Sequence, residues 1–380
     1  MPDQFSSVVT TGLGGRMINS VKGILVGFIF FIVSFGLLYW NEGRADLSVV
    51  AKQAVSIDAS VQNTALDGKL VAAKGDLHTD ALLGDGLFLN PGPFLAVQRT
   101  VEMYAWVEKE SSQTNKNLGG SETTTKTYTY DKEWTSSPTE SSRFAHPEGH
   151  TNPAPTLQSA TIRAAAASLG LYALNVPALE LPPMTSISLN SQSINVASTL
   201  GATLASPDYI FISQTAGDTL NAPQIGDERV SYGYIGSNDS ALIFAKLDGF
   251  KLSPYVTSKG DTLYRAFLST KDQAIAQMHS EYSSLTWILR LVGFLLMWIG
   301  LAMLLDPVSV FLDILPIAGS ISRSLIGLMT FVIALVLTIV TIVVSMILHS
   351  LIAVIVALVI TLIVVGLVLK NKYRKAPSTS

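Results

Sequence analysis

Cysteine is absent from the 380-residue chain, and charged side chains make up only 14% of it. Without cysteine the chain can form no disulfide, no thiolate nucleophile and no cysteine-ligated metal site. Its formal net charge of -3 leaves no basic excess to neutralise a phosphate backbone, so we expect no nucleic-acid partner. With 48% hydrophobic residues and a mean hydropathy of +0.40, the composition is that of a membrane protein.

Signatures of common enzyme classes are also missing, since no HExxH, GxSxG or Walker A motif occurs. His146 and His150 flank Glu148 in a short loop, and these three side chains could ligate a metal ion. The proline and glycine residues of that loop favour a hydrogen-bonded turn instead. We therefore expect no catalytic residue, no cofactor and no bound metal.

The apolar residues gather at the two ends of the chain. Residues 23–40 are uncharged and, at 1.5 Å per residue, can cross a hydrocarbon core about 30 Å thick. A cleaved signal peptide is the alternative, but Tyr39 and Trp40 close the run as an interfacial belt would. A second transmembrane helix is predicted at 285–305, where Arg290 can extend to the interface.

A longer uncharged run covers residues 324–369 and as one helix would measure about 69 Å, twice the membrane thickness. It must fold back, and His349 with Ser350 is the polar break near its middle. This predicts transmembrane helices at 325–348 and 351–369. Residues 306–324 have the pattern of an amphipathic interfacial helix, with a re-entrant segment as the alternative.

Four crossings place both chain ends on one side of the membrane. Basic residues precede the first apolar run and follow the last, so the positive-inside rule predicts that residues 1–22 and 370–380 are cytoplasmic. Residues 41–284, in which acidic residues outnumber basic ones, are then extracytoplasmic.

The large segment between the first two apolar runs has the pattern of a folded, mostly β domain. Apolar and polar residues alternate from 97 to 108, and further strands are predicted at 185–198, 208–213, 227–236, 241–247 and 262–268. Helices are predicted at 161–172 and 270–284, the second leading directly into the helix at 285–305. The predicted fold class is an α+β membrane protein with four transmembrane helices and a mixed, mostly β extracytoplasmic domain at 41–284.

Aromatic residues mark one candidate interaction or structural site. A hairpin that pairs the strand at 97–108 with the next one would bring Tyr104 and Trp106 opposite Tyr128 and Tyr130, with Trp134 on the same face. Cross-strand packing explains such a ladder, and a docking surface for a ligand or partner is the alternative.

The remaining candidates are polar. His150 and Asn152 lie between Gly149 and Pro153, which can hold an unusual backbone while the two side chains offer hydrogen bonds to neighbouring loops, near Asp227 and Arg229.

Six separated motifs resemble those of the transmembrane protein 43 (LUMA) family, in the family's order. They are NEGR at 41–44, VEMYAWVE at 101–108, TYTYDKEW at 127–134, GHTNP at 149–153, GDERVSY at 226–232 and PYVTSKGDTL at 254–263. The resemblance implies a multi-pass protein with cytosolic termini and its large domain in the lumen or periplasm, and it supplies no catalytic residues. Departures at 111–125, at 164–167 and in the very aliphatic last two apolar runs look more like a bacterial relative, which suggests a bacterial inner membrane with residues 41–284 in the periplasm.

Together these features predict a non-enzymatic membrane scaffold. Its exposed domain would bind membrane or extracytoplasmic proteins, lipid head groups or its own copy in a homo-oligomer, and its helices would anchor it in the lipid bilayer. An ion channel or channel subunit is the alternative, although the last two apolar runs hold hydroxyls and no buried charge. An enzyme acting on lipid or cell-envelope substrates is the third hypothesis.

Overall fold

The computed structural model describes residues 3–117, 120–196, 201–215, 217–312 and 318–349. The chain divides into two compact units. The first, called the β unit here, consists of residues 1–8, 46–113 and 125–279, and the second, called the helical unit, consists of residues 9–45, 114–124 and 280–380. The chain therefore passes several times from one unit to the other, and its amino-terminal residues belong to the β unit.

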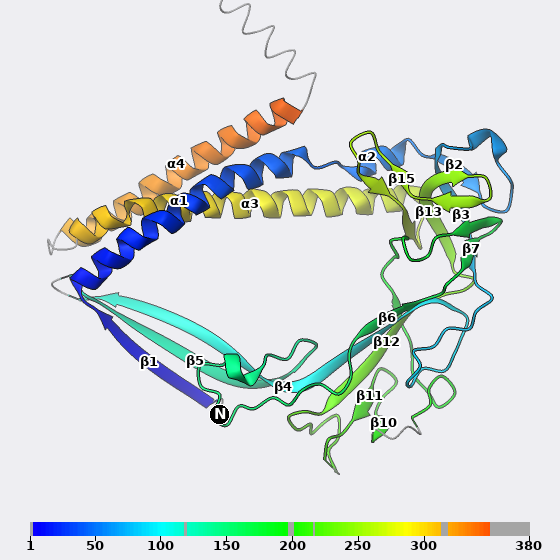
Figure 1. Cartoon of the computed structure of the whole chain (residues 1–380), viewed down its shortest axis with the longest axis horizontal. Helices are drawn as coiled ribbons and strands as arrows, with labels where there is room; N and C mark the ends of the chain where they lie inside the picture. The colour runs from blue at the N-terminus through cyan, green and yellow to red at the C-terminus, as the bar shows by residue number, and fades with distance from the viewer. Residues whose placement is uncertain (1–2, 118–119, 197–200, 216, 313–317, 350–380) are drawn as a thin grey trace, which may run out of the picture. The chain divides into compact units, whose positions relative to one another are not determined.

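One sheet of the β unit orders its strands β1-β5-β4-β12-β11-β10, with β6 on β4 and β9 on β12 (Figure 1). Strands β4 and β5 form a long hairpin, with β1 along its edge. Isoleucine and valine side chains from β4, β11 and β12 pack with Phe88 and Leu89 to form its core. The strands are β1 (Asp3–Thr11), β4 (Phe94–Lys116), β5 (Glu122–Thr135), β6 (Ala160–Arg163), β9 (Thr185–Ser186), β10 (Ala202–Leu204), β11 (Ile210–Ile212) and β12 (Glu228–Gly236).

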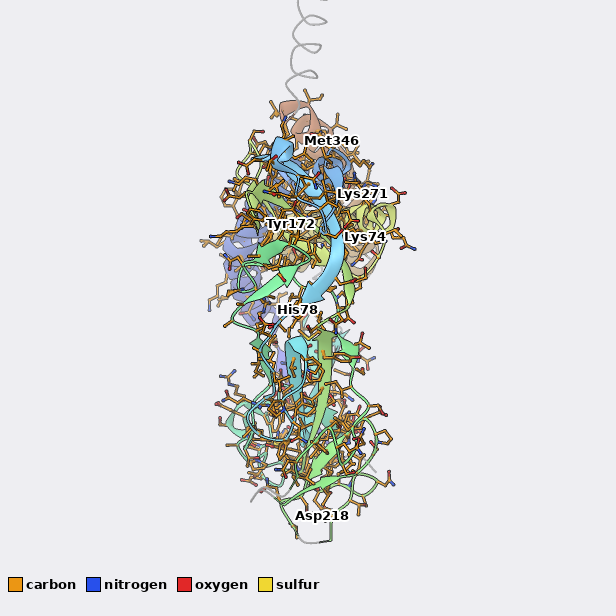
Figure 2. All side chains as sticks on the ribbon, turned by 90° about the vertical axis from the view of Figure 1, so that its right-hand side faces the viewer. Lys74, His78, Tyr172, Asp218, Lys271 and Met346 are labelled. Carbon is orange, nitrogen blue, oxygen red and sulfur yellow. The ribbon has the colours of Figure 1, made fainter. Side chains whose placement is uncertain are left out.

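The second sheet follows the order β17-β13-β14-β8-β7-β3-β2, and β13 also pairs with β3. The pairings β13–β14–β8–β7–β3–β13 therefore close a ring of five strands around an apolar interior. Tyr172 of β8 and Lys74 and His78 of β3 mark this region in Figure 2. The strands are β2 (Val55–Asp58), β3 (Leu70–His78), β7 (Ala167–Leu169), β8 (Tyr172–Leu174), β13 (Ser240–Asp248), β14 (Lys251–Ser253) and β17 (Arg265–Phe267).

Short elements complete the β unit. A separate pair of strands, β15 (Tyr255–Val256) and β16 (Thr262–Leu263), forms a small hairpin. Helix α2 (Leu47–Lys52) begins at Asp46, whose carboxylate accepts a hydrogen bond from the Ser48 amide. The 3-10 helices are η1 (Thr64–Leu66) and η2 (Ser141–Arg143).

Within the part of the chain that the structure describes, three long helices are apolar enough to span a membrane, namely α1 (Leu13–Gly43), α3 (Lys271–Leu312) and α4 (Ala318–His349). They pack in the helical unit around Leu38, Met297 and Ala334. Glycines allow the closest approach, because a Cβ added to Gly27 would lie 2.8 Å from the backbone oxygen of Gly300. Most of their large apolar side chains point outward, as expected for helices surrounded by lipid.

The prediction of a mostly β domain and of apolar helices at 23–40, 285–305 and 325–348 is confirmed. The fourth predicted transmembrane helix, at 351–369, and the basic tail lie outside the described residues. The helix expected at 270–284 is the first part of α3. Residues 306–312 continue α3 through Pro307, and α4 begins at residue 318, so no separate helix occupies the predicted amphipathic segment among the residues that the structure describes.

The helix predicted at 161–172 is wrong, since this segment contains β6, β7 and the start of β8. Its alanines favour a helix locally, but β6 pairs antiparallel with β4 over residues 160–163. Arg163 donates hydrogen bonds to the backbone oxygens of Val176 and Leu179, at 3.1 and 2.9 Å. Tertiary pairing therefore overrides the local preference.

Candidate functional site: two motif clusters in the β unit

His150 is the centre of one group of predicted residues, called the His150 cluster here, with Tyr128, Tyr130, Trp106 and Asn152. Its ring is 2% exposed, stacks on Tyr130 at 3.8 Å and meets Trp106 edge-on at 4.8 Å. Tyr128 lies at the border of the cluster, with its ring 5.5 Å from that of His146. Three of the predicted aromatic residues thus pack against two histidines of the loop at 146–150.

The pairing of the aromatic ladder differs from the expected one. Tyr104 packs against Trp134, with ring centres 5.3 Å apart, rather than opposite Tyr128 or Tyr130. Trp106 lies beside Lys132, whose ammonium is 4.7 Å from the indole ring. The register follows from where β4 ends and β5 begins, at Lys116 and Glu122, and alternation along each strand does not reveal these positions.

Both imidazole nitrogens of His150 have partners. Nδ1 is 3.0 Å from the backbone oxygen of His146, and Nε2 is 3.3 Å from a carboxylate oxygen of Asp3. Gly149 adopts a φ of +81°, a conformation that favours glycine, and so permits the turn that precedes His150. Glu148 is exposed, and among the described residues no group of three potential ligands is placed to hold a metal ion.

Tyr130 links the His150 cluster to β4. Its hydroxyl donates a hydrogen bond to the Glu108 carboxylate and accepts one from the His146 amide at 2.9 Å. Burial and the Glu108 carboxylate raise the pKa of Tyr130 to about 12. The hydroxyl is therefore held protonated, as a structural donor, throughout the physiological range.

The side chain of Asn152 forms backbone hydrogen bonds of the kind that a neighbouring strand would form. Its carboxamide accepts a hydrogen bond from the Trp106 amide at 2.7 Å and donates to the Trp106 carbonyl at 2.9 Å. It also donates to the backbone oxygen of Thr139 at 3.0 Å. The side chain thereby satisfies both backbone groups of Trp106 and ties the loop after β5 to β4.

We expect Asn152→Ala to lower the free energy of unfolding by about 1–3 kcal/mol, because the amide and carbonyl of Trp106 lose their partner. Asn152→Asp keeps the acceptor, loses the donor and should cost less. Thermal unfolding of the purified full-length chain in detergent measures both effects, with alanine at the exposed Asn221 as the matched control. Equal melting of Asn152→Ala and wild type would contradict this role.

Arg229 organises a second group, called the Arg229 cluster, with Tyr104, Trp134 and Glu102. Arg229 and Glu102 face each other across β12 and β4, and Nε of Arg229 lies 2.7 Å from a Glu102 oxygen. The guanidinium also lies 4.7 Å from the ring of Trp134 and 4.5 Å from that of Tyr209. An ion pair and two cation–π contacts thus join β12 to β4, to β5 and to Tyr209, the residue before β11.

Asp227 has a different role from His150 and Asn152. Its buried carboxylate accepts hydrogen bonds from the amides of Gln214 and Gln224, at 2.9 and 2.7 Å, and so shapes the loop before β12. The adjacent Glu228, also fully buried, accepts from the hydroxyl of Thr156 at 2.6 Å. The motifs at 149–153 and 226–232 nevertheless lie close together, because the ring of Pro153 lies close to Gly226.

Sequence reasoning missed a third polar network, centred on Asp85. This carboxylate is fully buried and accepts from the hydroxyl of Tyr232 at 2.6 Å and from Arg99 at 2.9 Å. The backbone amides of residues 87, 88 and 89 also donate to it, at 3.0, 3.0 and 2.8 Å. Burial alone would raise the pKa of Asp85, but these donors lower it below the ordinary value of 3.8. The Asp85-Gly86 pair, typical of turns, is its only sequence signal.

The NEGR motif forms a fourth network, in the helical unit. Glu42 accepts two hydrogen bonds from Arg290, both of 2.8 Å, while Asn41 donates to the Thr286 carbonyl at 3.2 Å. Arg44 lies over the ring of Tyr282, at 5.3 Å. Arg290 thus has a buried carboxylate partner on α1, a contact that the pattern of one apolar helix does not reveal.

Comparison with known proteins agrees with the positions of these motifs. The sequence profile of transmembrane protein 43 matches residues 103–351. Rat transmembrane protein 43 is 28% identical over 324 residues, which cover 80% of this chain and 78% of the rat protein. The human protein is 28% identical over 330 residues with the same coverage, and a Drosophila melanogaster homolog is 27% identical over 294 residues, 73% of this chain and 74% of its own length. No solved structure matches significantly. The chain is therefore an integral membrane protein that belongs to the transmembrane protein 43 family.

Proposed function

We propose that this protein is a non-enzymatic membrane scaffold, whose helical unit anchors it in the bilayer and whose β unit binds a protein partner, lipid head groups or a second copy. The sequence departures at 111–125, at 164–167 and in the last two apolar runs favour a bacterial inner membrane, and the basic carboxyl-terminal tail with the acidic segment at 41–284 favours an orientation with that segment in the periplasm. This placement is part of the proposal.

The proposal rests on the contacts that the motif side chains make. His150, Asn152, Asp227 and Glu228 hold loops to strands through their own hydrogen bonds, and Arg229 is enclosed by a carboxylate and two rings. Catalytic groups instead need access to a substrate and a position from which to exchange protons with it. Because these motif side chains are engaged in contacts within the protein, they favour a rigid domain that binds a partner over a catalytic site.

The hydroxyls of α4 bear on the channel alternative. Thr330 and Thr341 donate hydrogen bonds to the carbonyls four residues earlier, at 2.9 and 2.7 Å. Thr338 is 5% exposed and contacts the sulfur of Met297 on α3. These contacts favour a packing role for the hydroxyls over a pore-lining one.

Purification of the full-length chain in mild detergent tests the proposal. We expect a partner, or a second copy, at a fixed stoichiometry that persists through size exclusion with light scattering. Metal analysis and ion flux of the reconstituted protein are measured on the same sample. Stoichiometric metal with turnover that depends on His150 would establish an enzyme, and ion flux abolished by changes in α3 or α4 would establish a channel. Either result would refute the scaffold.

A further inference from the structure

The sheet formed by β4 and β12 has one face turned away from its apolar core. Val101 and Val230 pair directly across these two strands, and both belong to the core. Successive residues of a strand point to opposite faces, so the next pair, Thr100 with Ser231, lies on the other face. This face of the β unit therefore carries hydroxyls where the core face carries valines.

A cavity of about 280 Å³ lies on this polar face. Side chains of β4 and β12 line one part of it, and residues from the segments at 184–187 and 208–209 line the rest. A Cβ added to Gly233 would lie 3.0 Å from the Cβ of Met184, so glycine allows the first of these segments to approach the sheet closely. The cavity, called the β12 cavity here, is thus lined by residues of the β unit alone.

The loops around the β12 cavity are held in place by hydrogen bonds. The hydroxyl of Ser206 accepts from the amides of Asp208 and Tyr209, at 3.2 and 3.1 Å. The amide of Ile187 donates to the carbonyl of Tyr232 at 2.9 Å, which joins the segment after β9 to β12. A site that is built in advance loses little free energy to the ordering of loops and side chains when it binds a ligand.

Polar side chains that line the β12 cavity are unpaired. Among the residues that the structure describes, no hydrogen bond within the protein is made by the side chains of Gln98, Thr100, Ser186, Ser231 and Asp208. The motif side chains of the His150 and Arg229 clusters, in contrast, bond within the protein. The donors and acceptors of the cavity are therefore available to a ligand.

The chemistry of the lining indicates a neutral ligand that is rich in hydroxyls. Hydroxyl and amide side chains both donate and accept hydrogen bonds, and the Asp208 carboxylate accepts them. The described residues that line the cavity include no lysine, arginine or histidine, so a phosphate or carboxylate group would meet only negative charge there. Ile187 and the ring of Tyr209 add apolar surface beside these polar groups.

Sugar rings combine the same two features, since they carry hydroxyls around the edge and C–H groups on their faces. The volume of about 280 Å³ is near the lower end of the range for small-molecule sites, about 300–1,000 Å³, and so suits a single ring. We propose that the β12 cavity binds a neutral pyranose ring, either as a free monosaccharide or as the terminal residue of a glycan. This activity goes beyond the scaffold function and does not depend on it.

Binding of sugars to the full-length protein tests the proposal. The protein is purified in a detergent without a sugar head group and titrated calorimetrically with glucose, galactose, mannose and N-acetylglucosamine, while an array presents the same sugars at the ends of immobilised glycans. We expect saturable binding of at least one of them. Binding of the free monosaccharide identifies the first source, and binding on the array alone identifies the second. No saturable binding of either form, or tighter binding of the anionic glucuronate than of glucose, would overturn the proposal.

Two variants test whether the sugar binds in the β12 cavity. Asp208→Ala removes a charged acceptor and should weaken binding about tenfold or more. Ser231→Val replaces a lining hydroxyl with a larger apolar group that strands favour, and it should abolish binding. Asp80→Ala, at an exposed side chain outside the cavity, is the matched control and should bind as wild type does.

Melting curves establish that each variant is folded before its affinity is compared. The two variants are judged separately, so the loss of the fold in one leaves the other as the test. Wild-type affinity in a folded Asp208→Ala and a folded Ser231→Val would overturn the proposal, even if the wild-type protein binds a sugar elsewhere.

Discussion

Replacing Asp85 with alanine is expected to lower the free energy of unfolding of the β unit by about 3–5 kcal/mol, because it breaks a buried ion pair from one side. Arg99 loses its carboxylate partner, and Tyr232 and three backbone amides lose an acceptor. Loss of tryptophan fluorescence or near-ultraviolet ellipticity on heating the full-length chain measures the change. Asp80→Ala, at a side chain that is 99% exposed, is the matched control and should stay within about 0.5 kcal/mol of wild type.

The pH dependence provides an independent check of the Asp85 network. Because the folded-state pKa of Asp85 lies below 3.8, its contribution to stability is present above pH 3.8 and is lost as the pH falls through the folded value. The difference in melting temperature between wild type and Asp85→Asn should therefore be largest above pH 3.8 and shrink below it. A difference independent of pH would show that the carboxylate charge is not what stabilises the fold.

Removal of Glu42 is expected to have a similarly large effect on the helical unit, about 3–5 kcal/mol, since Arg290 would be left buried without its carboxylate. Both bonds of this pair measure 2.8 Å, and Glu42 is 4% exposed, so solvent replaces the lost partner poorly. The measurement is resistance to unfolding in a denaturing detergent, followed by the helical circular dichroism signal. Lys22→Ala, an exposed position on the same helix, serves as the control.

A double variant distinguishes the contribution of the ion pair from the separate contributions of Glu42 and Arg290. Glu42→Gln with Arg290→Met removes both charges, so it should be more stable than Glu42→Ala alone if the cost arises from an orphaned arginine. Additive losses in the single and double variants would instead assign the effect to packing at each site and contradict the importance of the ion pair.

Composition and periodicity determined the local features of this protein. Long uncharged runs can only be helices in lipid, and period-two alternation at 97–108 and 227–236 requires strands with one face buried, so these elements could be predicted without any partner. Asn152 could be singled out because Gly149 and Pro153 lie close to it in the loop, and Asp227 and Arg229 were expected to be its neighbours. The polar character of these side chains can be read directly from the local sequence.

Only the tertiary structure decided which partners those elements and residues contact. Residues 160–163 form a strand because β4 offers them backbone partners. Arg290 pairs with Glu42, 248 residues earlier in the chain, and His150 lies beside Asp3, 147 residues earlier. Such contacts depend on how the chain returns to itself, which hydrophobic periodicity does not encode. The charge rule likewise considers only the residues that flank each apolar run, whereas Arg16 near the start of α1 pairs with Glu122 of the β4–β5 hairpin. The partners of these charged side chains are therefore a property of the folded chain, because they follow from contacts between distant segments.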